Sequence, residues 1–188
     1  MALRISRLTA VVVALALAMG GCGKPFGGRV VYQGDYPSYQ SAAELVERAT
    51  LVIEATVARP RVDKLYASDG GTDPKANPQA GAPEAVEDTG VVITVWSATI
   101  GKVHKGAGKP GDVIDVQQMG GLLDGVTYEQ QDGVPFREGT TYLLFVETFP
   151  DAPAALLNPT QAQYEVNQDG TYRPVSAANQ ITVNRGDL

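Results

Sequence analysis

The sequence contains a single cysteine, a single histidine and a single tryptophan in 188 residues. One cysteine excludes an intramolecular disulfide, and one histidine excludes the histidine clusters and the His-Glu-x-x-His motif that bind zinc. Basic residues are also few, with 15 lysines and arginines against 21 aspartates and glutamates. Nucleic-acid binding depends on clustered positive charge, so we expect no nucleic-acid partner. We also expect no metal and no cofactor.

The N-terminal apolar run, residues 8–19, is too short to cross a bilayer as a permanent helix. It follows a basic head that contains Arg4 and Arg7, and a glycine pair comes after it. This order of basic, apolar and small residues is typical of a secretory signal peptide. The pattern therefore predicts that residues 1–21 are a signal peptide and do not belong to the fold.

Residues 18–22, Ala-Met-Gly-Gly-Cys, resemble the bacterial lipobox. The resemblance implies cleavage between Gly21 and Cys22, and acylation of Cys22 through its thiol. Each buried methylene is worth about 0.8 kcal/mol, so two or three acyl chains hold a protein to a membrane without a spanning helix. We therefore expect a lipid-anchored protein at the extracytoplasmic face of the cell membrane. The alternative is an ordinary signal peptide with a cysteine nearby by chance.

The predicted signal peptide contains two arginines and no acidic residue, so the chain without it has a formal charge of −8. Residues 22–39 are rich in glycine, proline and tyrosine, and this composition predicts a flexible tether. The remainder, residues 40–188, is expected to form a single domain. Within it, residues 66–89 are dense in Gly, Pro and Asp and nearly lack large apolar side chains, which predicts a disordered insertion.

One short helix is predicted near the start of the domain. Ser41 and Glu44 have the spacing of a capping box, and the apolar stripe that follows indicates a helix ending near residues 48–50. Alternating apolar residues over 51–58 then predict a strand with one face more exposed to solvent than the other. Helix and strand are expected to follow each other almost without a loop.

The longest strand is predicted over residues 91–103. Its apolar residues lie on one face before Trp96 and on the other face from Trp96 onward. A strand that changes its buried face usually bulges or coils, as small closed barrels require. We expect an irregular stretch at residues 120–139 and five or six strands in all. The later strand segments lie at residues 114–116, 141–149, 164–166 and 171–174, and residues 181–183 could add an edge strand.

Three segments in this order resemble the netrin-like domains related to tissue inhibitors of metalloproteinases, especially the cysteine-poor bacterial lipoproteins of that type. They are SAAELVERATLVIEATV, VVITVWSATIGKVHKG and GVPFREGTTYLLFVET. The most specific pieces are the Val-His-Lys-Gly step at 103–106 and the strand at 139–145. The resemblance covers residues 41 to about 166 and implies a mainly β, OB-like barrel, an architecture whose members mostly bind something. Protease inhibition is not carried over, because it needs a free N-terminal cysteine amine.

Aromatic side chains supply a candidate ligand face. Trp96, Tyr128 and Tyr142 could form a stacking surface in the mouth of a barrel, and the alternative is that they are core residues. On this basis we expect a binding or protein-interaction module without catalysis. Its partner would be an extracytoplasmic protein or a small-molecule ligand.

Two other functions remain open. A small cell-envelope hydrolase could use His104 as a general base for Ser97 or Thr99, but no nucleophile elbow is present, and a solvent-facing histidine at a strand end is the simpler interpretation. The other is a structural envelope protein, which would assemble with a partner and bind no small ligand.

Overall fold

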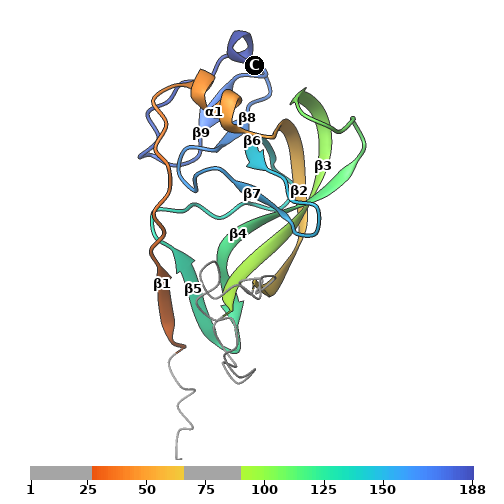
Figure 1. Cartoon of the computed structure of the whole chain (residues 1–188). Coiled ribbons are helices and arrows are strands. Elements are labelled where there is room, and N and C mark those ends of the chain that lie inside the picture. The colour runs from red at the N-terminus through yellow and green to blue at the C-terminus, as the bar shows by residue number, and fades with distance from the viewer. Residues whose placement is uncertain (1–26, 66–89) are drawn as a thin grey trace, which may run out of the picture.

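The computed structural model describes residues 27–65 and 90–188. The predicted signal peptide, Cys22 and the predicted insertion at 66–89 lie outside the described residues. The described part is mainly β with one short α-helix, as expected (Figure 1). The elements in chain order are β1 (Arg29–Tyr32), α1 (Ala42–Arg48), β2 (Leu51–Leu65), β3 (Val91–Lys105), β4 (Val113–Leu123), β5 (Val126–Gln130), β6 (Thr141–Glu147), β7 (Ala154–Leu156), β8 (Gln163–Val166), β9 (Tyr172–Pro174) and a 3-10 turn, Arg185–Asp187.

Helix α1 begins at the predicted cap. The Ser41 hydroxyl accepts a hydrogen bond from the Glu44 backbone N–H, while the Glu44 carboxylate accepts one from the Gln40 backbone N–H. These contacts satisfy backbone donors that the first turn of a helix leaves unpaired. The helix ends at Arg48, and β2 begins three residues later.

The strands form one sheet whose pairing order is β1-β5-β4-β3-β2-β6-β8-β9. Strand β7 pairs with β4 in parallel and with β6 antiparallel. Because β6 also pairs with β2, the pairings run through β2, β3, β4, β7 and β6 and return to β2. The sheet is therefore partly closed into a ring. The described residues form nine strands, more than the five or six that the sequence predicted.

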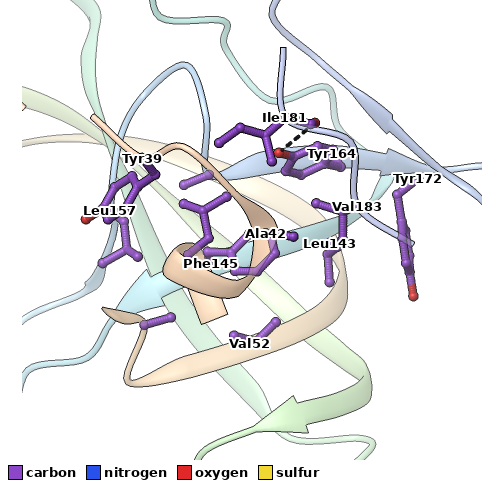
Figure 2. Packing of buried hydrophobic residues seen from close by; sticks show 13 residues of the cluster. Tyr39, Ala42, Val52, Leu143, Phe145, Leu157, Tyr164, Tyr172, Ile181 and Val183 are labelled. Carbon is purple, nitrogen blue, oxygen red and sulfur yellow. Dashed lines mark hydrogen bonds between the residues drawn. The ribbon is translucent and has the colours of Figure 1, made fainter. Parts of the chain in front are cut away.

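Strand β6 separates two hydrophobic clusters, as its apolar residues on both faces predicted. Leu143 and Phe145 belong to one cluster, which α1, β8 and the C-terminal residues cover (Figure 2). Tyr142, Leu144 and Val146 belong to the other, which lies inside the ring and contains Trp96. A central strand buried on both faces is the expected result of a continuous apolar run.

The predicted change of face in β3 coincides with an irregularity in its partner strand. The β2–β3 register shifts between Ala58 and Arg61, opposite Trp96. Arg59 takes a positive φ of 49° there, and its backbone N–H donates to the Glu138 carboxylate. A bulge of this kind bends a strand and increases its twist, which lets β3 bury one face before Trp96 and the other after it.

Two segments that the sequence placed in loops are ordered strands. Residues 29–32 of the predicted tether form β1, which pairs in parallel with β5. The predicted irregular stretch at 120–139 begins instead with the β4–β5 hairpin, where residues 120–123 pair with 126–129. Both segments alternate too weakly in hydrophobicity to read as strands, because glycine and polar residues interrupt them.

The C-terminal part also differs from the prediction at two places. Phe149 lies beyond β6 and is 42% exposed, so it does not extend the buried strand. Ile181 and Val183 form no strand but are buried in the cluster under α1, and the Ile181 carbonyl accepts a hydrogen bond from the Tyr164 hydroxyl (Figure 2). Side-chain burial, not sheet pairing, holds this segment.

Candidate functional site

A cavity of about 620 Å³ lies against the β3–β4–β5 part of the sheet. Its lining is mostly apolar, and it includes two of the three predicted ligand-face residues, Trp96 and Tyr128. The other lining residues come from β2 to β5, from β7 and from the segments that follow β1, β5 and β7: Tyr36, Leu65, Ile93, Thr94, Gln117, Gln118, Met119, Gly120, Gly121, Thr127, Glu129, Gln130, Gly133, Val134, Pro135, Ala155, Leu156 and Pro159. Concave, mostly apolar sites of this kind are typical of small-molecule binding.

Aromatic residues of the N-terminal segment help to form the cavity. Tyr32 of β1 stacks on Tyr128, with ring centroids 5.8 Å apart. Its hydroxyl accepts a hydrogen bond from the Val92 backbone N–H, which fixes β1 to the start of β3. Tyr36 lines the cavity itself, and its hydroxyl donates to the Met119 sulfur at 2.9 Å. Burial raises the pKa of Tyr36, so this group stays protonated at neutral pH.

A pair of glutamines holds the segment that forms another wall. The Gln118 and Gln163 side-chain amides both donate to the Val134 carbonyl, and the Gln118 oxygen accepts from the Phe136 backbone N–H. Gln118 also donates to Gln163. These bonds tie a segment without secondary structure to β4 and β8, so the wall at residues 133–135 has a defined position.

Two buried polar atoms on the cavity residues lack partners. Among the described residues, the indole N–H of Trp96 and the side-chain amide oxygen of Gln117 are buried and make no hydrogen bond. Both residues line the cavity. An unpaired buried polar group costs about 1 to 3 kcal/mol, so natural proteins keep such groups rarely. The two atoms themselves are covered from solvent, and the pairing of Trp96 with Val116 and of Gln117 with Val95 puts the two side chains on opposite faces of the sheet.

The third predicted residue, Tyr142, is not part of the cavity. It is 1% exposed, it packs on Phe136 with ring centroids 5.0 Å apart, and its hydroxyl accepts from the Arg137 backbone N–H. Tyr142 belongs to the core inside the ring, which was the alternative that the sequence left open.

Sequence reasoning missed most of the polar and N-terminal wall. The sequence places Tyr36 in the predicted tether and Val134 in the predicted irregular stretch. It gives no indication that Gln117 lines a site. One signal was present: tyrosines at positions 32, 36 and 39 are unusual in a linker, because large aromatic side chains favour burial.

His104 lies elsewhere, at the end of β3, and its surroundings correct the sequence interpretation. Its side chain is 7% exposed, not solvent-facing. The Nε2 atom is 2.9 Å from Glu54 Oε1, and the same oxygen accepts a 2.7 Å hydrogen bond from the Tyr172 hydroxyl. Thr99 is five residues away along the strand, or about 16 Å. His104 therefore joins β2, β3 and β9 and does not contact the hydroxyl groups proposed as nucleophiles.

The Glu54 carboxyl has a shifted pKa. Burial raises it, but hydrogen bonds from Tyr172 and His104 and the positive charge of Lys102 lower it by more, so that the net pKa lies below its usual value. Burial and the bond to Glu54 raise the pKa of Tyr172. A carboxyl with a depressed folded-state pKa stabilises the fold above its unfolded-state pKa, and this contribution is lost as the pH falls through the folded-state value.

This cluster predicts a pH-dependent loss of stability in Glu54→Gln. The variant should be less stable than wild type at pH 7, and the difference should shrink below about pH 4.3, where the unfolded-state carboxyl is protonated. Urea unfolding at pH 7, 5, 4 and 3 measures it. Glu47→Gln, which changes an exposed carboxylate on α1, is the control and should follow wild type. If the difference in free energy of unfolding between wild type and Glu54→Gln is the same at all four pH values, the prediction is wrong.

The described residues contain neither a metal-binding cluster nor a membrane-spanning helix. No three His, Cys, Asp or Glu side chains come together there as a metal site would require. The helices of that part of the chain are also too short or too polar to span a membrane. Comparison with protein-family models, with curated proteins and with solved structures finds no match for this chain.

Proposed function

We propose that this chain is an extracytoplasmic lipoprotein, anchored through acylated Cys22, whose β domain binds a small and largely apolar molecule without catalysis. The observation that carries the binding role is the cavity on β3, β4 and β5. Its volume of about 620 Å³ lies within the range of about 300 to 1,000 Å³ that small-molecule sites occupy.

The wall of the cavity indicates the chemistry of the ligand. Trp96 and Tyr128 offer aromatic surfaces, so a flat or extended apolar body would fit. The unpaired Trp96 N–H and Gln117 oxygen are covered from solvent, so these two atoms do not specify a polar group on the ligand.

The position of the cavity in the fold supports the same role. The ring of five pairings is compatible with an OB-like barrel, which is a five-stranded and partly open structure. Counted from β2, strands β3 and β4 are the second and third strands of that ring, and OB domains bind ligands on the face of those two strands. This correspondence makes a binding module the most economical interpretation.

The described residues that line the cavity support binding without catalysis. Within the described part of the chain, its one carboxylate is Glu129, which forms an ion pair with Arg29. No histidine, cysteine or lysine among residues 27–65 and 90–188 lines it, so these residues supply no paired acid and base there. The hydrolase alternative would need His104 to act at a separate place, and a structural role would need no cavity at all.

Trp96 makes the binding proposal directly testable, because it is the single tryptophan of the chain. The apolar probe N-phenyl-1-naphthylamine should quench the fluorescence of Trp96 in a saturable manner as it enters the cavity. Ala155→Phe, which fills the cavity from β7, should weaken the apparent affinity at least tenfold. The measurement is a fluorescence titration of the purified protein.

Ala152→Phe is the matched control, since it makes the same change three residues earlier at an exposed position outside the cavity. It should bind the probe like wild type. Equal affinities for all three proteins, or no saturable quenching in wild type, would refute the proposed site. Circular dichroism of each variant verifies that its strands are intact.

A further inference from the structure

The β4–β5 hairpin ends in an exposed leucine. Leu122 is 65% exposed, the largest value among the exposed large apolar side chains of the described residues. It precedes the Asp124-Gly125 turn, at the end of the molecule opposite the C-terminus (Figure 1). Val62 lies beside Gly121 at this end, and Leu65 is the last residue of β2. Val62, Leu65 and Leu122, which we name the apolar end, are each more than a third exposed.

The start of the described chain lies against the same hairpin. The Gly28 carbonyl accepts a 2.8 Å hydrogen bond from the Thr127 backbone N–H. Gly27 approaches the turn so closely that a Cβ added to it would lie 2.5 Å from the Gly125 carbonyl oxygen. These contacts fix where the chain leaves the domain toward Cys22.

The length of chain between that point and Cys22 is short. Gly27 is five residues after Cys22, and five residues span at most about 18 Å. If Cys22 carries acyl chains, the turn at Asp124 and Gly125 is held within that distance of the point where the lipid enters the bilayer. The hairpin therefore lies, with β1, in the part of the described domain that this anchor holds close to the membrane.

We propose that the apolar end docks on the surface of the lipid bilayer, with Leu122 in the interfacial region. The proposal rests on the lipid anchor of the proposed function and adds an orientation to it. Exposed apolar side chains near a membrane gain free energy by entering the interface, and a leucine at a hairpin tip can do so without unfolding the strands. The contact is apolar, because Arg29 at this end is already paired with Glu129 and the chain without its leader is acidic.

The lipidated protein itself provides the experiment, since acylation consumes the one native thiol. Leu122→Cys then carries the single reactive thiol and can be labelled with nitrobenzoxadiazole in vesicles of phosphatidylcholine and phosphatidylethanolamine. Val113→Cys is the matched control, because Val113 begins the same strand, is 52% exposed and lies roughly 30 Å from Leu122. Nitroxide groups on the lipid acyl chains should quench the label at 122 at least threefold more than the label at 113. Asp124→Cys tests the turn independently of Leu122.

Equal quenching at 122, 124 and 113 in protein that is acylated and bound to the vesicles would overturn the docking proposal and leave the lipid anchor intact. Protein without acyl chains by mass spectrometry would instead refute the anchor. Quenching at 122 that persists in 1 M salt is also expected, because the contact does not depend on charge. Loss of this quenching in salt would contradict an apolar contact.

Discussion

Replacing Cys22 with serine should abolish the incorporation of labelled palmitate into this protein. Serine has no thiol to form the thioether with diacylglycerol, and the proposed anchor depends on this single atom. Cleavage of the signal peptide should fail as well, because in the lipobox resemblance the lipid is attached before the chain is cut. The mass of the variant should therefore match the full-length chain with Met1 retained or removed. Metabolic labelling and intact-mass spectrometry measure both effects.

Gly23→Ala is the control for this change, because it alters the next residue and leaves the thiol in place. It should incorporate label like wild type. An unmodified thiol at Cys22 in the purified wild-type protein would refute the lipoprotein proposal. In that case the ordinary signal peptide, which the sequence left as the alternative, becomes the better interpretation of residues 1–21.

The elements that could be predicted from the sequence are those specified by local patterns. The capping residues around Ser41 and the alternation after Leu51 depend on neighbours a few residues apart, and the structure has both elements in the expected places. The apolar residues on both faces of β6 also predicted its central position between two clusters. Periodicity reports burial directly, so strongly periodic segments are the most predictable.

The change of buried face in β3 and the family resemblance indicated a barrel, but the strand that closes the sheet could not be predicted in the same way. The closure depends on β7, a strand of three residues in a segment marked by prolines, with no periodic pattern of its own. Strand β1 has only four residues and pairs with a strand about a hundred residues later. Such elements form because a long-range partner offers unpaired backbone groups, and the local sequence carries little information about that partner.

The candidate site likewise has features that the local sequence predicts and features that depend on long-range contacts. Trp96 and Tyr128 could be recognised as possible ligand contacts from their residue type alone. The difference between Trp96 and Tyr142 could not, because both belong to the core cluster inside the ring and only Trp96 also reaches the cavity. The pairing of Tyr36 with Met119 joins segments 83 residues apart, so this part of the wall exists only in the folded state.

The glycine at the end of β3 provides the last and sharpest test of the fold. Gly106 closes the Val-His-Lys-Gly step that the sequence singled out, and it has a φ of +91°. A Cβ at this position would lie 2.3 Å from the Thr50 carbonyl oxygen and 3.0 Å from the Leu51 Cα. Both atoms belong to the backbone between α1 and β2, so neither can move without displacing the helix or the strand.

Gly106→Ala should therefore destabilise the protein much more than Gly111→Ala. Gly111 lies in the same β3–β4 connection with a φ of +93°, but a Cβ there would meet nothing within 4 Å. Its replacement costs only the backbone strain of about 1 to 2 kcal/mol, whereas Gly106→Ala adds an overpacking cost of about 1 to 3 kcal/mol. Urea unfolding of the two variants measures the difference. Equal losses would mean that the helix–strand junction can shift freely, and that β3 is not packed against it as closely as the structure requires.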